Sequence, residues 1–174
     1  MISMIAAVGK GLELGYQGDL IWRLPEDLKR FKEVTKGHTV LMGYRTFVSL
    51  PKLLPGRKHI VLTNNVDDVL SEAEKKDCID SSRPEVVPIT ELFEFIDKYK
   101  GADEELFIIG GGSVYKQVLP YADKLYLTEI AADFPEADVY FPSFNRADFR
   151  REVVRKGRNE RYDLAYSFAI YTRK

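Results

Sequence analysis

The sequence has little cysteine or histidine, and neither residue occurs in a pattern that binds a metal. The single cysteine, Cys78, has no partner for an internal disulfide and supplies no thiolate cluster for zinc. The two histidines, His38 and His59, lack the spacing of metal ligands. We therefore expect a chain from a reducing compartment, without a disulfide framework and without a metal site.

Long hydrophobic runs and an excess of charge of one sign are also missing. Lysine and arginine number 26 against 27 acidic residues, a formal net charge of −1, so no basic surface for nucleic acid or anionic membrane is expected. No apolar run reaches the roughly 18 residues of a membrane helix, and residues 1–8 lack the basic region of a signal peptide. These absences predict a cytoplasmic monomer that binds neither nucleic acid nor membrane.

What is present is the length and composition of one globular domain over residues 1–174, with 45% hydrophobic residues. Short apolar runs alternate with helical patterns, which predicts an α/β fold with a mostly parallel sheet. The expected strands are Ile2–Val8, Thr39–Met42, His59–Thr63, Glu85–Ile89, Leu106–Ile109 and Lys124–Ile130, followed by an antiparallel hairpin around Gly157 formed by Arg151–Arg155 and Tyr166–Thr172.

Helical periodicity occurs between these strands. The charged stretch Val66–Pro84 is expected to be a helix or a loop on the outer flank of the fold. The clearer helices are one that begins at Pro25 with Leu24, Leu28, Phe31 and Thr35 on one face, one over Leu92–Tyr99 capped by Gly101, and one over Ser113–Leu119 that ends before Pro120.

Asp27 lies at the edge of the apolar face of the first helix. Helical residues follow each other at about 100°, which places Asp27 about 40° from Phe31. Glu26, Arg30 and Glu33 project away and are expected to be solvated. A carboxylate on an apolar edge is costly to bury without a donor or a cation, so Asp27 is a candidate for ligand recognition. The alternative is an acid that only interacts with the helix dipole.

Two glycine-containing turns each connect a strand to a helix. One is Ile108–Tyr115, with three consecutive glycines, and the other is Leu41–Thr46, with Gly43 and the cation of Arg45. Glycine allows close approach of a ligand to the backbone, and helix N-terminal amides favour anions, so the two turns could hold the halves of a dinucleotide. Neither turn matches a standard nucleotide-binding fingerprint, and ordinary turn geometry is the alternative.

A third turn, Leu54–Lys58, places two cations before a strand. Arg57 could bind a carboxylate through a bidentate pair of hydrogen bonds. The alternative is a surface cation beside a Pro-Gly turn.

In order and spacing, these blocks resemble the dihydrofolate reductase family over nearly the whole chain. The resemblance implies an eight-stranded, mostly parallel twisted sheet flanked by helices, with an antiparallel C-terminal strand. It also implies reduction of 7,8-dihydrofolate to tetrahydrofolate by NADPH, which supplies one-carbon metabolism and thymidylate synthesis and is the target of antifolate inhibitors. The matching segments are Met1–Ala7, Trp22–Leu28 with Phe31 and Lys32, Val40–Gly43 with Thr46, Leu54–Lys58, Ile109–Tyr115, Leu125–Thr128 and Asp138–Pro142.

The resemblance also implies the site residues. The catalytic set would be Asp27, Thr128, Trp22 and Leu20, with Asp27 accepting hydrogen bonds from the pterin 2-amino group and N3. The substrate would contact Ile5, Ala6, Asp27, Leu28, Phe31, Lys32, Leu50, Leu54, Arg57, Ile109, Tyr115 and Thr128. NADPH would contact Ala7, Leu14, Gly15, Gly18, Asp19, Leu20, Gly43, Tyr44, Arg45, Thr46, Leu62, Thr63, Asn64, Gly110, Gly111, Gly112, Ser113, Val114, Tyr115 and Gln117.

Three of these assignments are more specific. The segment Leu14–Leu20 would be the mobile lid over the nicotinamide, Arg57 would bind the glutamate α-carboxylate, and the Gly110-Gly111 peptide would be cis. In the mechanism that the resemblance implies, hydride moves from nicotinamide C4 to pterin C6 in a dry pocket while N5 gains a proton from water. The negative charge of Asp27 would make the bound pterin easier to protonate.

The chain departs from the family at three places. Ile21 stands where proline is usual, and the region between Thr63 and Leu106 is longer than in compact bacterial members. Tyr44 stands where many bacterial members have an arginine that pairs with the 2′-phosphate of NADPH. Arg45, Thr63 and Asn64 are other possible contacts, so the preference for NADPH over NADH stays open from the sequence.

Two other functions compete with this interpretation. A pyrimidine reductase of riboflavin synthesis would share the fold and the cofactor, and a folate- or nucleotide-binding protein would bind without catalysis. The acidic segment Trp22–Asp27 and the turn Pro55–Arg57 favour a pterin with a carboxylate tail over a ribosyl substrate.

Overall fold

The computed structural model describes residues 1–76 and 82–174. Two sheets are present, an eight-stranded sheet and a small three-stranded one. The strands are β1 (Ile2–Val8), β2 (Glu13–Tyr16), β3 (Asp19–Leu20), β4 (Thr39–Gly43), β5 (Lys58–Leu62), β6 (Glu85–Val87), β7 (Leu106–Gly110), β8 (Lys124–Ile130), β9 (Val139–Tyr140), β10 (Phe149–Asn159) and β11 (Leu164–Arg173).

The large sheet has the order β10-β11-β8-β1-β7-β4-β5-β6. Its six strands from β8 to β6 are mutually parallel, whereas β11 runs antiparallel to β8 and to β10. The predicted eight-stranded, mostly parallel sheet with an antiparallel C-terminal strand is therefore confirmed.

Helices cover both faces of the large sheet. The helices are α1 (Pro25–Thr35), α2 (Tyr44–Ser49), α3 (Val66–Lys75), α4 (Leu92–Asp97) and α5 (Gly112–Val118). Buried residues of α2 and α3 pack in one apolar cluster with half-buried residues of α1, and those of α4 and α5 pack in another on the opposite face. Because the central strands are covered on both sides, they are apolar without alternation.

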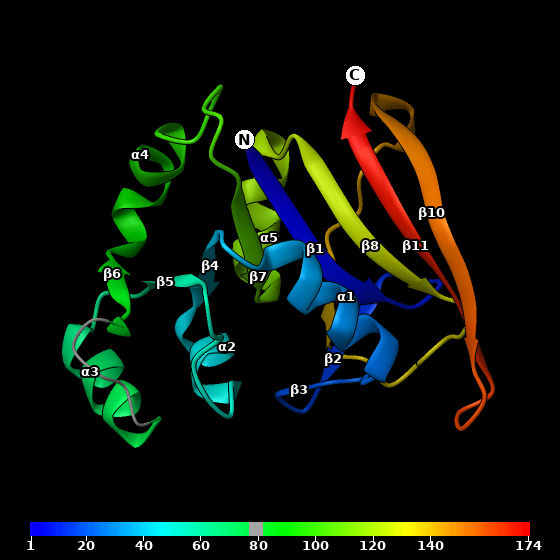
Figure 1. Ribbon diagram of the computed structural model, residues 1–174, viewed down its shortest axis with the longest axis horizontal. Coiled ribbons are helices and arrows are strands. Elements are labelled where there is room, and N and C mark those ends of the chain that lie inside the picture. Colours follow the sequence, from blue (N-terminus) through cyan, green and yellow to red (C-terminus); the bar gives the residue numbers. More distant parts are fainter. Residues whose placement is uncertain (77–81) are drawn as a thin grey trace.

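The carboxyl ends of the parallel strands lie at one edge of the sheet, at the bottom of the view in Figure 1. Both chain termini lie at the opposite edge. In the strand register, Ala7 of β1 is level with Thr128 of β8, and Met42 of β4 is level with Gly110 of β7. Helices α2 and α5 begin immediately after β4 and β7. The motifs singled out in the sequence therefore meet at the edge where open α/β sheets bind ligands.

The C-terminal hairpin differs from the prediction in the position of its turn. The strands β10 and β11 are joined by residues 160–163, and Gly157 lies within β10, paired with Tyr166. A Cβ atom at Gly157 would lie 2.3 Å from the Tyr166 hydroxyl. Glycine at this position therefore makes room for a side chain of the neighbouring strand and does not form the turn.

Two further differences concern short or charged segments. Strands β2, β3 and β9 form a three-stranded sheet that no periodicity predicted, because two of them have two residues each. Within Val66–Pro84, residues Val66–Lys75 form α3, capped by the Asn65 side chain. The expectations for Cys78 and for residues 77–81 lie outside the described part of the chain. No helix in the described residues has the length and apolarity to cross a membrane.

Candidate active site

The carboxylate of Asp27 faces the large sheet from the first turn of α1. It accepts a hydrogen bond from the hydroxyl of Thr128 on β8, with 2.5 Å between Oγ1 and Oδ1. Burial raises the pKa of Asp27, and the Thr128 hydrogen bond and the positive charge of Arg30 oppose that effect. The structure thus brings together the acid and the hydroxyl that the resemblance pairs, at an apolar edge of α1.

Arg30, expected to be solvated, is buried, with 7% of its surface exposed. Its guanidinium carbon lies 4.6 Å from the centre of the Phe168 ring, and Nη1 lies 3.4 Å from the Thr128 hydroxyl oxygen. On the helix, Arg30 lies about 60° beyond Asp27, on the side away from Leu28. Leu28 is 53% exposed, so the buried face is rotated toward Asp27 and the wheel centred on Leu24 and Leu28 misplaced Arg30. Glu26 was also expected to be solvated, but it is half-buried and accepts hydrogen bonds from Asn159. Glu33 is exposed, as expected.

The carboxyl end of β1 lies beside this acid. Tyr115 of α5 is buried, and its hydroxyl donates a hydrogen bond to the carbonyl of Ile5 at 2.7 Å. Ala6 and Ala7 follow as half-buried residues, level with Leu127 and Thr128 of β8. Small side chains at this point leave room at the end of the strand, and the tyrosine holds the backbone in place.

Trp22 packs just before α1, with its ring edge-on to Phe134 at 6.4 Å between centres. Its Nε1 is the one buried side-chain polar atom without a hydrogen-bond partner among the described residues. A buried donor without a partner is costly, so such an atom indicates a place where a water molecule or ligand completes the hydrogen bonding.

The two glycine turns lie against each other. A Cβ atom on Gly110 would be 3.1 Å from the Thr46 hydroxyl oxygen, and one on Gly43 would be 4.0 Å from the amide nitrogen of Gly111. Gly43 and Gly111 precede α2 and α5 as their N-terminal caps, and the Gly110-Gly111 peptide is cis, as the resemblance implies. The two turns together form a single surface of backbone without side chains. The sequence of either turn alone did not show that they would meet.

Other residues assigned to the cofactor surround these turns or follow β5. Arg45 and Ser113 are exposed, whereas Leu62 and Val114 are buried. Tyr44, Thr63, Gly112 and Gln117 are half-buried. The side-chain oxygen of Asn64 accepts a hydrogen bond from the amide of Ile89 at 2.9 Å, so this side chain also organises the neighbouring loop.

The segment Leu14–Leu20 forms most of a hairpin beside the site. Gly15 pairs with Leu20 and, on the other side, with Val139 of β9. The Gln17 amide donates to an Asp138 carboxylate oxygen at 2.9 Å, and Gly18 has a positive φ of 79°. Asp19 pairs with Arg23, and Leu20, at the end of β3, is 55% exposed. The hairpin is anchored through β9, with an exposed apolar side chain at the end of β3.

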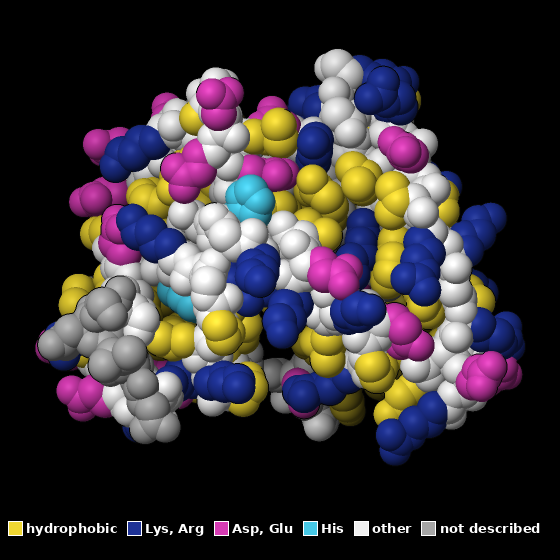
Figure 2. Space-filling model, in the orientation of Figure 1, with side chains coloured by type: hydrophobic (Ala, Val, Ile, Leu, Met, Phe, Trp, Pro, Cys, Tyr) yellow, Lys and Arg dark blue, Asp and Glu magenta, His cyan; other side chains and the backbone are white. Residues whose placement is uncertain are grey.

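Apolar side chains from α1, from the segment after α2 and from β7 lie around a hollow between α1 and α2. Phe31 of α1 and Leu50, Leu54 and Ile109 are half-buried members of one apolar cluster. Figure 2 shows this hollow at the lower centre of the displayed face, bordered mainly by Lys and Arg side chains. These residues of the expected substrate wall therefore share one apolar cluster, although they are far apart in sequence.

Arg57 lies at the C-terminal end of α1. It donates hydrogen bonds to the carbonyl of Lys32 at 2.8 Å, to the Thr35 hydroxyl at 3.1 Å and to the carbonyl of Pro55 at 2.6 Å. Burial lowers the pKa of Arg57. These contacts fix a cation at the end of the hollow that lies away from Asp27, since they hold it to the last turn of α1.

His59 has a role that sequence analysis missed. Its Nε2 accepts a hydrogen bond from the backbone amide of Leu54 at 2.9 Å, which requires a neutral imidazole. Burial and the charge of Arg57 lower the pKa of His59 to about 4. The signal was available, because a histidine in a predicted buried strand needs a partner when it is not a metal ligand.

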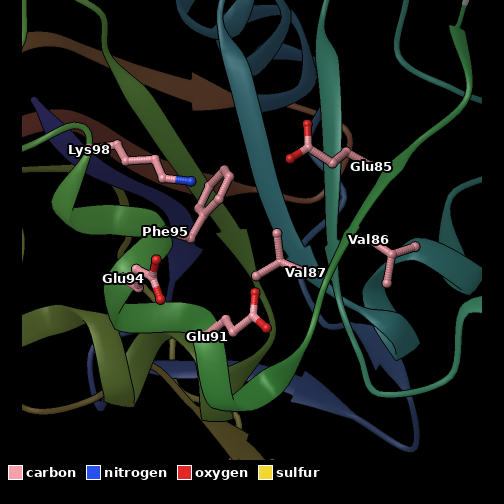
Figure 3. A pocket seen from close by; sticks show the side chains of 7 residues that line it. All are labelled: Glu85, Val86, Val87, Glu91, Glu94, Phe95 and Lys98. Atoms are coloured by element: carbon pink, nitrogen blue, oxygen red, sulfur yellow. The ribbon is translucent and has the colours of Figure 1, made fainter.

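The described residues contain no group of three His, Cys, Asp or Glu side chains arranged to hold a metal. The hollow between β6 and α4 is lined by three glutamates, Glu85, Glu91 and Glu94, but also by Lys98, whose ammonium lies 5.5 Å from the centre of the Phe95 ring (Figure 3). This hollow is at the β6 edge of the sheet and contains none of the residues discussed above.

The fold and the site define an α/β enzyme with a nucleotide-binding turn region and a half-buried acid, Asp27, at the carboxyl ends of the strands. The sequence model for dihydrofolate reductase matches residues 1–173. The chain is 36% identical over 175 residues to the dihydrofolate reductase of Bacillus subtilis, covering 100% of this chain and 95% of that protein. It is 34% identical over 173 residues to that of Staphylococcus haemolyticus, covering 99% and 95%.

A solved structure, dihydrofolate reductase from Enterococcus faecalis complexed with NADP(H) and RAB-propyl, superposes with a TM-score of 0.79 at 30% identity, covering 100% of this chain and 96% of that one. The chain therefore belongs to the dihydrofolate reductase family. It is an NADPH-dependent reductase of dihydrofolate. These matches favour this function over the alternative of a pyrimidine reductase.

Proposed function

We propose that Asp27 is the anionic anchor of dihydrofolate in this reduction and that the hollow between α1 and α2 holds the substrate. The observation that carries the proposal is the Asp27–Thr128 pair, which joins a half-buried carboxylate to a buried hydroxyl at the carboxyl ends of β1 and β8. An ionised carboxylate in such a place pairs with a cyclic amidine-like group that presents two N–H donors, as the pterin 2-amino group and N3 do.

The apolar residues of the hollow, among them Leu28, Phe31, Leu50 and Leu54, exclude water from the folate ring and its neighbour. Arg57 binds the glutamate α-carboxylate at the far end, because its guanidinium is held there by the Lys32 carbonyl and the Thr35 hydroxyl of α1. Trp22 donates its free indole N–H to a water molecule beside Asp27, which supplies a route for the proton that N5 needs.

The residues of the two glycine turns fit an NADPH molecule. Gly43, Gly110 and Gly111 leave the backbone uncovered, and a Cβ atom added at any of them would occupy that space. When bound, NADPH supplies the hydride. Backbone amides at Gly111–Ser113 and Thr46 hold its diphosphate, while Ile5, Ala6 and Ala7 place its ring against the substrate. Arg45, exposed on α2, takes the 2′-phosphate with its guanidinium.

The catalytic contribution of Asp27 is electrostatic. Its negative charge favours protonation of the bound pterin, and the low dielectric around it strengthens that effect. Leu20, exposed at the end of β3 in the segment Leu14–Leu20, closes over the ring edge and excludes water. The hairpin's attachment to β9 through Asp138 defines the position from which it closes.

The proposed function includes the partners of the protein and its location. The protein acts as a cytoplasmic monomer of one domain, residues 1–174, that binds dihydrofolate and antifolate inhibitors but neither nucleic acid nor membrane. The balanced charge of −1 and the interspersed acidic and basic side chains in Figure 2 support this view.

The experiment compares two variants in an assay of dihydrofolate-dependent NADPH oxidation. Asp27→Asn lowers turnover by roughly 10²–10⁴ at neutral pH, the usual scale for losing a proton-transfer aid. Arg57→Leu, at the other end of the hollow, raises the KM for dihydrofolate and changes the hydride-transfer rate far less. Near-normal turnover of Asp27→Asn would exclude the role assigned to Asp27, and an unchanged KM would remove Arg57 from the site.

A further inference from the structure

Arg30 is a buried cation that the proposed function does not use. Its guanidinium makes no ion pair with a carboxylate in the described part of the chain, and its hydrogen bonds are long: 3.3 Å to the Leu127 carbonyl, 3.4 Å to the Thr128 hydroxyl and 3.5 Å to the Ala169 carbonyl. Its other contacts are with the faces of two rings, Phe168 at 4.6 Å and Tyr126 at 6.0 Å. A buried charge with such weak direct partners is costly, which suggests that its charge acts on something nearby.

The first consequence concerns the Thr128 hydroxyl. A hydroxyl group has one proton to donate and two lone pairs to accept with. Because Thr128 accepts from the Arg30 guanidinium, which can only donate, its own proton is directed to Asp27. Arg30 therefore fixes the direction of the hydrogen bond that the carboxylate receives.

The second consequence concerns charge. The groups that face Asp27 are Arg30 on the same helix, Thr128 on β8 and the buried Tyr115 of α5, and among these Arg30 is the cation. Arg30 in turn faces Tyr126 of β8, whose hydroxyl donates to Glu105 at 3.3 Å. From β11 it meets only Phe168 and a backbone carbonyl. The Arg30 charge lowers the pKa of Asp27 against the opposing effect of burial.

We propose that Arg30 is a positioning residue of the substrate site, which orients Thr128 toward Asp27 and keeps the Asp27 carboxylate ionised by a buried charge one turn away. The inference rests on the proposed role of Asp27. It adds that the acid limit of substrate binding is set by Arg30, because the carboxylate must be ionised to accept the hydrogen bonds of the pterin.

Two variants of the full-length protein separate the two contributions of Arg30. Arg30→Gln retains an N–H donor for Thr128 but removes the charge, and Arg30→Lys retains the charge but loses the planar guanidinium. Lys29→Met is the matched control, since Lys29 is the neighbouring cation on the exposed side of α1. The readouts are the titration of Asp27, followed by carboxyl ¹³C resonances of the ligand-free protein, and the pH profile of kcat/KM for dihydrofolate.

In Arg30→Gln we expect the Asp27 titration and the acidic limb of kcat/KM to move together to higher pH, with kcat/KM on that limb about tenfold lower than in the unaltered protein. Arg30→Lys restores the position of the limb and most of kcat/KM. Lys29→Met leaves both curves in place. A purely structural arginine would change the amplitude of activity without moving the limb.

An unshifted Asp27 titration in folded Arg30→Gln would overturn the inference. If Arg30→Gln does not fold, Arg30→Lys decides: a limb in its original position supports the inference, and a limb that moves despite the retained charge overturns it. Asp27→Asn is measured in parallel. Normal turnover in that variant contradicts the proposed function itself, whereas an inactive Asp27→Asn beside an unshifted Arg30→Gln contradicts only the role of Arg30.

Discussion

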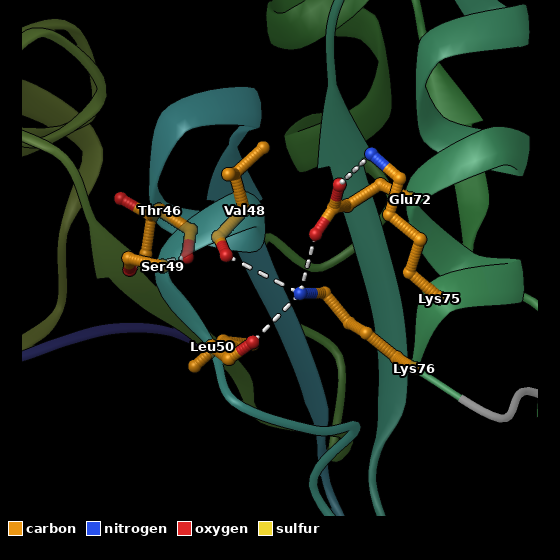
Figure 4. Close-up of polar contacts among 7 residues, drawn as sticks. All are labelled: Thr46, Val48, Ser49, Leu50, Glu72, Lys75 and Lys76. Atoms are coloured by element: carbon orange, nitrogen blue, oxygen red, sulfur yellow. Dashed lines mark hydrogen bonds and ion pairs between the residues drawn. The ribbon is translucent and has the colours of Figure 1, made fainter.

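Two cations are buried in different regions of the protein, and they are neutralised in different ways. The Lys76 side chain, 5% exposed after the end of α3, pairs with Glu72 at 2.8 Å and donates to the carbonyls of Leu50 at 2.7 Å and Val48 at 3.2 Å (Figure 4). Arg30, on the sheet-facing side of α1, has only longer hydrogen bonds and two aromatic faces. Lys76 has a close carboxylate and Arg30 has none in the described part of the chain.

The difference indicates what each charge does. An ammonium group has three N–H donors, and Lys76 donates to three acceptors. Its charge is therefore fully paired, and these bonds join the end of α3 to the end of α2. Arg30 is incompletely matched by direct partners, and its field extends to Asp27. A fully paired buried cation therefore holds structure together, whereas an incompletely paired one next to an acid tunes that acid.

The largest effect we expect from testing this comparison is on stability, at Lys76. Lys76→Met leaves two carbonyl groups without their donor and removes the buried, closer partner of Glu72, so the free energy of unfolding falls by roughly 3–5 kcal/mol. The control is Lys75→Met, because Lys75 also pairs with Glu72, at 3.2 Å, but its side chain is 71% exposed. We expect the control to lose at most about 1 kcal/mol. Urea denaturation measures both, and equal losses would contradict the assigned difference.

His59 shows a third way in which this protein accommodates a buried titratable group, because its imidazole is kept neutral. Its pKa is about 4 in the folded protein, against an ordinary value of 6.5. Between these values the unfolded chain binds a proton that the folded protein does not, so stability is full above about pH 6.5 and falls as the pH drops toward 4. The loss is about 3 kcal/mol, from 1.36 kcal/mol per pKa unit.

The measurement is the free energy of unfolding between pH 4 and 7, with His59→Gln as the control. The glutamine oxygen can still accept a hydrogen bond from the Leu54 amide but does not titrate. The contribution of this residue to the slope should vanish in the variant. A slope that is the same with and without the histidine would show that other groups cause it.

Most of the fold was predictable, because the central strands are apolar and are separated by segments of helical periodicity. The runs Ile2–Val8 and Lys124–Ile130 were predicted with the bounds that the structure has. The sheet formed by β2, β3 and β9 was not predictable, since it depends on pairing between residues more than 100 positions apart, such as Gly15 with Val139. The Gly157 turn was misplaced because a glycine that makes space looks the same in sequence as one that turns the chain.

The site shows the same division. Asp27 and the glycine turns were identified from local patterns and from the family resemblance, and the structure brings them to one edge of the sheet. Arg30 and His59 were missed because each is defined by what packs on it: β8 and β11 for Arg30, and the Leu54 amide for His59. A helical wheel gives the angle of a residue but not the direction in which the sheet lies.

The smallest effect is expected at Gly157, and it sharpens the comparison because its neighbour Tyr166 stacks on Phe168, the ring beneath Arg30, at 5.1 Å between ring centres. Gly157→Ala would place a Cβ atom 2.3 Å from the Tyr166 hydroxyl, so the ring must shift and stability falls by about 1 kcal/mol. Away from such a ring, the same exchange in a strand stabilises, since alanine loses less backbone entropy than glycine.

We therefore expect the effect of Gly157→Ala on stability to change sign: the exchange destabilises the protein that has Tyr166 and stabilises the protein that also carries Tyr166→Leu. Thermal unfolding of the four proteins of this cycle measures the coupling. Additive effects would mean that the ring of Tyr166 does not restrict position 157, and that the support beneath Arg30 is independent of this glycine.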